Sequence, residues 1–153
     1  MSDEPDFYQG VYKLQNPKKY LGTKSPVYRS SWERRSMVYF DTNKNVIAWA
    51  SENFQIEYVS PWDGKVHRYF PDIYVKCITK ENKIKEYVLE IKPKKQCEKP
   101  KEPKHKTAKA MENYKAACRL YAKNCAKWEA CKEFCRKRGY EFKLITENEI
   151  FGS

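Results

Sequence analysis

The residues of this sequence that could do chemistry are Asp72 and the triplet Glu90-Ile91-Lys92. A hard divalent cation polarises a phosphate and acidifies a water, and it prefers carboxylate and carbonyl oxygens. Glu90 and Lys92 stand two apart on an expected strand, so their side chains share one face, while Ile91 points into the core and keeps its backbone carbonyl available to a metal. The pattern predicts phosphodiester hydrolysis, with Asp72 and Glu90 on one cation and Lys92 holding the attacking water or stabilising charge on the phosphate.

The same residues also have an ordinary structural interpretation. A Glu-x-Lys pair on an exposed strand is common and usually solvated, and Pro-Asp before a strand is equally ordinary. Glu33 stands three residues after Ser30, so it can serve a capping box at the start of a helix or act as a further metal ligand. Three features favour chemistry: the strand residues around Glu90 (Tyr87, Val88, Leu89 and Ile91) are apolar, Glu33 opens a helix upstream, and a lysine-rich loop directly follows Lys92.

Length and composition indicate one domain with a packed core. The 153 residues are 41% hydrophobic and 15% aromatic, which excludes a disordered tail. The formal net charge of +11 favours a polyanionic partner, nucleic acid first and an acidic membrane surface second. No apolar run approaches the length that spans a bilayer. The acidic segment Met1–Asp6 does not resemble a secretory signal, so we expect a chain made in a reducing cytoplasm.

The cysteines form no CxxC pair, which makes the signal for a zinc site weak. Without a secretory signal, free thiols are the expected state. Four of them follow the apolar face of a long expected helix, where we interpret them as small buried hydrophobes, with a metal site as the minor alternative. The six cysteines are Cys77, Cys97, Cys118, Cys125, Cys131 and Cys135.

Hydrophobic periodicity and turn residues predict an α/β domain with a mixed central sheet flanked by helices. The spacing predicts a first helix that begins at Ser30 and stops at Asp41–Asn45. It predicts a second helix over Thr107–Arg138 that ends at Gly139 and packs its apolar face into the core. The expected strands are 46–50, 54–58, 65–69, 73–78, 84–91 and 140–145.

The chain divides by composition into an N-terminal arm, residues 1–27, and a single domain, residues 28–153. We expect the arm to be extended, with one short strand near Val11–Leu14. A loop over residues 92–106 holds seven Lys and three Pro. It is expected to bind a DNA backbone rather than base edges, and a merely solvated connection is the alternative. The expected DNA contacts are Lys94, Lys95, Lys99, Lys101 and His67, although a structural or surface role remains open for His67.

Several stretches carry a resemblance to known nucleases: Tyr28-Arg29-Ser30-Ser31-Trp32-Glu33, Tyr58-Val59-Ser60-Pro61, His67-Arg68-Tyr69-Phe70-Pro71-Asp72, Glu90-Ile91-Lys92-Pro93-Lys94 and Leu144-Ile145-Thr146-Glu147. They resemble two groups of the PD-(D/E)XK, restriction-endonuclease-like superfamily. One is the head-completion nucleases of large contractile-tailed bacteriophages, and the other is the N-terminal nuclease domain of the endonuclease subunit of heteromeric bacterial transposases. The phage group is favoured, because the transposase subunit carries a second domain and the resemblance runs from about Val11 to Phe151.

The resemblance implies that Glu33 completes the metal site from its helix, that Asp72 and Glu90 bind Mg²⁺ or Mn²⁺, and that Lys92 is the catalytic lysine. Gln96 follows the motif, but the spacing does not fix its role. It also implies an endonuclease that acts on DNA as phage heads are completed, with head or neck proteins as partners, in the virion and the host cytoplasm. Two alternatives stay open: a non-catalytic head or neck protein that binds the packaged DNA end, docked through an aromatic N-terminal arm, and a general basic nucleic-acid-binding protein.

Overall fold

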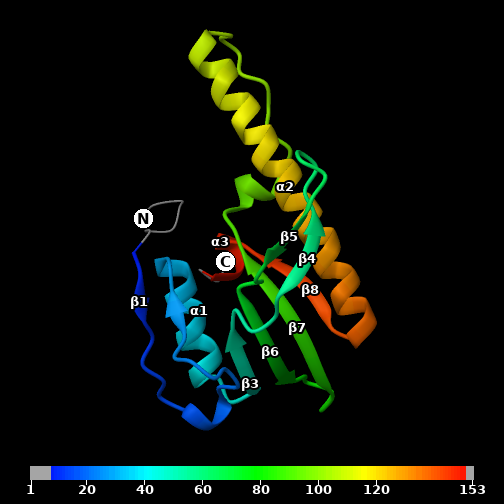
Figure 1. Cartoon of the computed structure of the whole chain (residues 1–153). Coiled ribbons are helices and arrows are strands. Elements are labelled where there is room, and N and C mark those ends of the chain that lie inside the picture. Colours follow the sequence, from blue (N-terminus) through cyan, green and yellow to red (C-terminus); the bar gives the residue numbers. More distant parts are fainter. Residues whose placement is uncertain (1–7, 151–153) are drawn as a thin grey trace.

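Four strands form the central sheet, in the order β3 (Val46–Ser51), β6 (Ile73–Ile78), β7 (Ile84–Ile91) and β8 (Glu141–Ile145). The computed structural model describes residues 8–150 (Figure 1). Residues 1–7, with the acidic start of the chain and Phe7, and residues 151–153 lie outside the described residues. β3, β6 and β7 are antiparallel, and β8 runs parallel to β7 after a long helical crossover. The predicted mixed sheet flanked by helices is confirmed.

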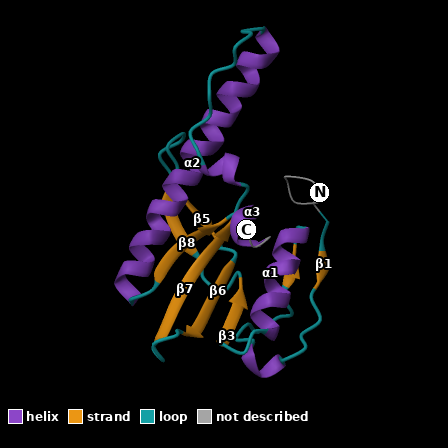
Figure 2. Cartoon of the chain, turned by 180° about the vertical axis from the view of Figure 1, so that it is seen from behind, coloured by secondary structure: helices purple, strands orange, loops and turns teal. Residues whose placement is uncertain are grey.

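The two faces of the sheet pack against different helices, because side chains along a strand alternate between them. Leu89 packs with Met37 of α1 (Ser31–Thr42), whereas its neighbour Val88 packs with Cys131 of α2 (Ala108–Arg138). Figure 2 shows the two helices on opposite sides of the sheet. Alternate residues of β7 therefore contact different helices: the face with Leu89 contacts α1, and the face with Val88 contacts α2.

A separate hairpin lies on the α2 side of the sheet. Its strands β4 (Ile56–Val59) and β5 (Val66–Tyr69) pair only with each other, so the two strands expected here are present but do not join the central sheet. The turn between them uses Gly64 at φ +68°, a conformation that favours glycine. The inner face of the hairpin is buried against α2. The hairpin and α2 thus form one layer above the sheet.

The N-terminal segment is part of the packed domain. Its short strand β1 (Gly10–Val11) pairs with β2 (Val27–Tyr28), and the one-turn helix η1 (Pro17–Lys19) follows β1. The buried Asp41 of α1 accepts hydrogen bonds from the Tyr12 hydroxyl at 2.8 Å and from the Gln15 backbone NH at 2.7 Å. Tyr20 packs edge-on against the buried Trp49, with ring centroids 4.8 Å apart. Tyr12 and Tyr20 therefore pack within this chain, whereas Tyr8 is 46% exposed.

The long helix α2 begins and ends as predicted. The Thr107 hydroxyl accepts from the Ala110 NH at 3.1 Å, and Gly139 closes the helix at φ +73°. Its 31 residues correspond to about 46 Å at about 1.5 Å per residue, whereas the eight residues of β7 span about 26 Å at about 3.3 Å each. The helix is therefore longer than the sheet, and its N-terminal half projects away from the sheet (Figure 1).

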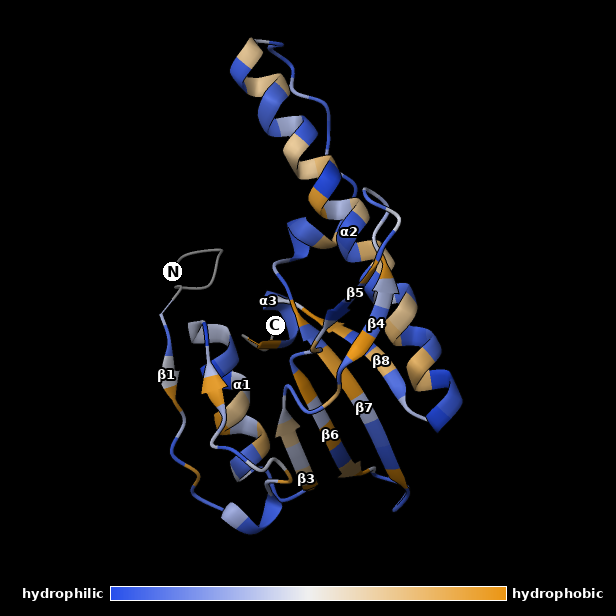
Figure 3. Cartoon of the chain, in the orientation of Figure 1, coloured by the Kyte–Doolittle hydropathy of each residue, from blue (hydrophilic) through white to orange (hydrophobic). Residues whose placement is uncertain are grey.

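This projection corrects the prediction that the whole apolar face of the helix packs into the core. Only the C-terminal half is deeply buried, at Trp128, Cys131 and Cys135. Tyr114 and Cys118 of the projecting half remain partly exposed. The loop that follows β7 starts with the one-turn helix η2 (Lys94–Cys97) and packs on this half, and Figure 3 shows that loop as mainly hydrophilic.

All six cysteines are free thiols, as expected, and Cys131 and Cys135 are buried. The chain closes the described region with the short helix α3 (Glu147–Ile150) after β8. Between residues 8 and 150, no helix combines the length and the apolarity that crossing a bilayer requires.

Candidate active site

The predicted catalytic residues meet at one end of the central sheet. Antiparallel pairing brings the end of β3, the start of β6 and the end of β7 together there, and the parallel strand β8 ends at the same place. The register of β6 and β7 puts Asp72 opposite Glu90, one step beyond the last paired residues. An ion pair between Arg29, just before α1, and Glu52, just after β3, brings the start of α1 to this end as well.

Asp72 is held in place by the backbone on both sides. Its Oδ2 atom accepts a hydrogen bond from the Ile91 NH at 2.7 Å, and its carbonyl accepts from the Glu52 NH at 3.0 Å. The carboxylate is thereby oriented across β7, towards the motif that ends that strand. This contact confirms that the two parts of the sequence motif are adjacent in space.

Glu90 is a buried acid with an unsatisfied oxygen. The residue is 6% exposed, and its Oε1 atom makes no hydrogen bond within the described structure. The indole NH of Trp128 lies close enough to lower the Glu90 pKa, but neither group attains hydrogen-bond geometry with the other. A buried carboxylate oxygen without a partner is costly, so this atom points to a group that is not part of the protein chain.

Glu33 occupies the first turn of α1. The Ser30 hydroxyl accepts from the Glu33 NH at 3.1 Å, which is one half of the capping box. The other half differs, because the Glu33 carboxylate accepts from the Arg29 NH at 3.0 Å instead of the Ser30 NH. Glu33 thus stabilises the helix start through Oε2, and its other carboxylate oxygen accepts no hydrogen bond within residues 8–150.

Burial and mutual repulsion raise the pKa of these acids. For Asp72 the pKa lies well above its ordinary value, first because of desolvation and then because of the charges of Glu90 and Glu33. The Ile91 NH and the Lys92 ammonium oppose this rise without cancelling it. The ionised form of Asp72 is therefore unfavourable until positive charge is added to the site.

Desolvation also raises the pKa of Glu90 and of Glu33. Lys92 lowers both, and it is the largest influence opposing desolvation at Glu90. Lys127 of α2 adds a second favourable charge at Glu90. The site is thus a cluster of three acids and two lysines in which desolvation prevails, a pattern that is enriched at functional sites.

The donor atoms suit a hard divalent cation. Within residues 8–150 no group of three or more His, Cys, Asp or Glu side chains is placed to hold a metal ion as it stands. The groups that could hold such an ion are the Asp72 and Glu90 carboxylates and the Ile91 backbone carbonyl, all of them oxygen donors of the kind that a hard cation prefers. The unpaired Glu90 Oε1 fits such an ion. The role of Glu33 as a ligand stays a prediction.

The predicted DNA contacts lie in two different places. His67 is on the hairpin, where its Nε2 atom contacts Asp63 Oδ2 at 2.8 Å, and no contact joins it to the acids. Lys94 lies beside α3, since its backbone NH donates to Glu147 at 2.7 Å. Gln96 is half-buried in η2. The remaining predicted contacts lie on the loop after β7, and all three are exposed: Lys95, Lys99 and Lys101.

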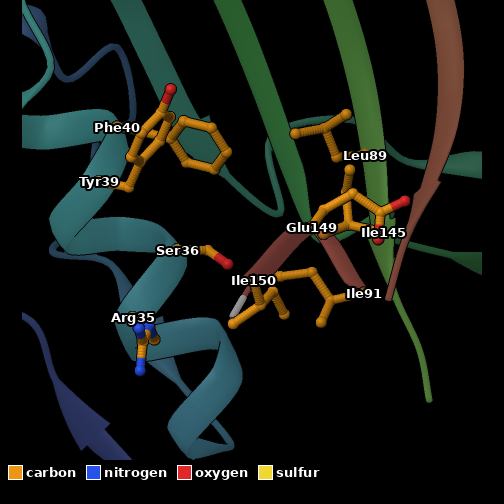
Figure 4. Close-up of a pocket in the computed structure, with 9 residues that line it drawn as sticks. All are labelled: Arg35, Ser36, Tyr39, Phe40, Leu89, Ile91, Ile145, Glu149 and Ile150. Atoms are coloured by element: carbon orange, nitrogen blue, oxygen red, sulfur yellow. The ribbon is translucent and has the colours of Figure 1, made fainter. Parts of the chain in front are cut away.

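A hollow of about 400 Å³ lies next to the site but on the other face of the sheet (Figure 4). α1 lines one side of it with residues such as Ser36 and Phe40, and Leu89, Ile91 and Ile150 line the other. None of the four predicted catalytic side chains lines it. The hollow confirms that the Ile91 side chain points away from the acids, as the strand alternation predicts.

Sequence reasoning missed Lys127, Trp128 and Arg29 as neighbours of the acids. Trp128 belongs to the apolar stripe of α2, and Lys127 stands at the edge of that stripe. The apolar stripe was the sequence feature that could have indicated these two residues, but it does not indicate which strand α2 crosses. Arg29 lies in one of the motif stretches, but nothing in the sequence indicates that its backbone NH holds the Glu33 carboxylate.

The fold and the site define a nuclease-like α/β domain, and comparison with known proteins agrees. Residues 43–147 match the family described as TnsA-like endonuclease N terminal. The chain is 36% identical over 144 residues to the head completion nuclease of Enterobacteria phage T4, covering 94% of this chain and 93% of that protein. The chain therefore belongs to the TnsA-like endonuclease family and is a relative of this phage nuclease.

Proposed function

We propose that this chain is a metal-dependent DNA endonuclease that hydrolyses phosphodiester bonds with Mg²⁺ or Mn²⁺. The observation that carries the proposal is the position of Asp72 opposite the buried Glu90, one of whose oxygens has no hydrogen-bond partner among residues 8–150. A buried acid beside a second, half-buried acid destabilises a fold unless positive charge compensates them. Membership of an endonuclease family supports the same reaction.

Each residue of the site has a role that its position supports. A bound divalent cation supplies polarisation of the phosphate and a more acidic water. Asp72 and Glu90 would hold this cation together with the Ile91 carbonyl, and their two strands fix their separation. Lys92 follows on the Glu90 face, where its ammonium can orient the attacking water and stabilise negative charge on the phosphate. Glu33 would complete the site from α1.

We propose DNA as the substrate and the region around the loop after β7 as its backbone-binding surface. The net charge of +11 supports a polyanionic substrate. The loop lies beside the projecting half of α2, so the two elements together form one projection that begins at the site. Lys99 and Lys101 are exposed on this projection. Such lysines contact phosphates and do not read base sequence.

The relative from phage T4 is named a head completion nuclease. We propose the same setting for this chain: it would act on phage DNA while heads are completed, in the host cytoplasm and in the virion, with head or neck proteins as partners. The support is 36% identity over 94% of the chain.

A plasmid-nicking assay tests the proposed reaction. Wild type should nick supercoiled plasmid with Mg²⁺ or Mn²⁺ and not with EDTA, and Asp72→Asn or Glu90→Gln should lower the rate by at least about 100-fold. Glu81→Gln is the matched control, because it removes the same charge from the turn at the opposite end of the same strands. Undiminished cleavage by Asp72→Asn would refute the site. DNA binding without any cleavage would support the non-catalytic head or neck alternative.

A further inference from the structure

Lys127 is a half-buried lysine on the face of α2 that looks towards the acids. Its ammonium lies 5.6 Å from the centre of the Tyr69 ring and 5.8 Å from that of Tyr58, within the range of cation–π contacts. The Tyr69 hydroxyl also donates to the Lys127 backbone carbonyl at 2.9 Å. The hairpin therefore fixes both the backbone and the head group of this lysine.

The two tyrosines form a preformed support for this positive charge. Tyr58 and Tyr69 are both buried, and their rings meet edge to face with centroids 5.9 Å apart. Within the described part of the chain, the Lys127 ammonium makes these ring contacts but no ion pair and no hydrogen bond. Its three N–H donors therefore remain available to a ligand.

Lys127 is also electrostatically part of the candidate site. The charges of Lys123 and Lys92 lower its pKa and those of Glu90 and Asp72 raise it, although the two acids come from a different layer of the fold. Desolvation lowers its pKa, so the protein keeps a cation here at some cost. A lysine held without a carboxylate partner beside a cluster of acids suggests a function beyond packing.

Formal charges show which ligand would balance the site. Glu33, Asp72 and Glu90 carry three negative charges when ionised, and Lys92 with one divalent cation carries three positive charges. A DNA phosphodiester then adds one negative charge that these groups leave uncompensated. Lys127 supplies the matching positive charge.

We propose that Lys127 binds a phosphate of the substrate DNA at the candidate site, as a second phosphate-binding cation beside Lys92. The inference rests on the proposed nuclease function and deepens it, because it assigns substrate binding to α2 and the hairpin. The aromatic pair Tyr58 and Tyr69 acts here as a positioning support for the ammonium. Such a contact requires the DNA backbone to pass between the end of β7 and the hairpin.

The test uses two substitutions that separate charge from packing. Lys127→Met keeps an unbranched apolar stem against the tyrosines but removes the charge, whereas Lys127→Arg keeps the charge and can stack on aromatic rings. Lys132→Met is the matched control, because Lys132 is exposed on the same helix and pairs with Glu129 at the surface. Thermal unfolding confirms that each variant is folded.

Duplex DNA binding is measured over a salt series with Ca²⁺, and plasmid cleavage is measured with Mg²⁺. Lys127→Met should reduce the salt slope of binding by about 0.9 and lower kcat/KM by roughly 100-fold. Lys127→Arg should retain kcat/KM within about tenfold of wild type, and Lys132→Met should match wild type. Wild-type binding and cleavage by Lys127→Met would overturn the proposal.

The DNA-binding measurement separates the failure of this proposal from the failure of the proposed function. If wild type binds DNA but never cleaves it, the nuclease assignment fails. The role of Lys127 is then decided by the salt slope alone: a slope reduced in Lys127→Met and not in Lys132→Met supports the phosphate contact, and an unchanged slope refutes it.

Discussion

The substitution Asp72→Asn should stabilise the metal-free protein while abolishing its response to metal. Asn retains an oxygen that can accept the hydrogen bond from the Ile91 NH, which is 2.7 Å from Asp72 Oδ2 in the structure. The substitution also removes the negative charge of Asp72, which the negative charges of Glu90 and Glu33 make unfavourable. The variant therefore keeps the local geometry and changes only the electrostatics.

The substitution should change both the stability of the metal-free protein and the stabilisation by Mg²⁺. Relief of unfavourable surface or site charges typically stabilises a domain by about 0.5–2 kcal/mol, so the metal-free variant should gain about that much. A cation at about 100 times its Kd stabilises the native state by about 2.7 kcal/mol. For a protein of this length, each kcal/mol raises the melting temperature by about 2–4 °C, so Mg²⁺ should raise Tm of wild type by about 5–11 °C and leave that of Asp72→Asn nearly unchanged.

The effect has a defined dependence on pH. The Asp72 pKa is raised in the folded state by desolvation and by neighbouring acids, so the metal-free native state binds a proton more tightly than the unfolded chain does. Stability of wild type is therefore lost as pH rises from the unfolded pKa of about 3.9 through the raised folded pKa. The stability advantage of Asp72→Asn should appear over this same window and vanish at lower pH.

Thermal unfolding by circular dichroism, with EDTA and with a Mg²⁺ titration, measures both effects. Glu81→Gln, which removes a carboxylate from the far turn, should behave like wild type in each titration. An equal Mg²⁺ response in wild type and Asp72→Asn would show that the ion binds elsewhere. A metal-free Asp72→Asn protein that is less stable than wild type at pH 7 would refute the electrostatic argument.

Three further predictions concern the fold and the DNA surface. Gly139→Ala should cost about 1 kcal/mol in the free energy of unfolding, because φ is +73° and nothing lies within 4 Å of the added carbon, so only the backbone conformation opposes it. Asp41→Ala should cost at least roughly 3 kcal/mol, since it leaves the Tyr12 hydroxyl and two backbone NH groups without their acceptor. Replacing the four loop lysines by Ala should reduce the salt slope of DNA binding by about 0.9 for each lysine that contacts a phosphate; these are Lys94, Lys95, Lys99 and Lys101.

Each has a matched control. Gly139→Asn should lose less stability than Gly139→Ala in chemical denaturation, because Asn tolerates the left-handed region, and equal losses would contradict the conformational argument. Asp41→Asn keeps one acceptor oxygen and should be milder than Asp41→Ala. Four exposed lysines from other parts of the chain provide the control for DNA binding, and an equal change of salt slope in both sets would make the loop a simple linker; these are Lys44, Lys80, Lys83 and Lys137.

The motif residues could be predicted from the sequence because local geometry places them. Residues two apart on a strand share a face, so Glu90 and Lys92 had to point the same way and Ile91 the other. The short turn after β6 returns the chain as an antiparallel neighbour, and this brings Asp72 to Glu90. The caps of the two main helices depend on residues within one turn of each end, and both helices begin and end close to the predicted positions.

The long-range contacts could not be predicted in the same way. The buried Asp41 stands on a helix face that the sequence alone does not distinguish from an exposed one, and its partners come from a segment more than 20 residues earlier. The projecting half of α2 has the same apolar spacing as the buried half. Only the length of the sheet beneath it decides where burial stops.

The sequence by itself therefore determined the α/β class, the helix limits and the motif Asp72, Glu90 and Lys92, since each depends on the period of a strand or helix or on a nearby turn. The tertiary structure decided which residues surround that motif. It placed Lys127 and the hairpin tyrosines beside the acids and directed His67 elsewhere. The reason is physical: the crossing of a helix over a sheet is set by packing between segments far apart in the chain, which no local spacing encodes.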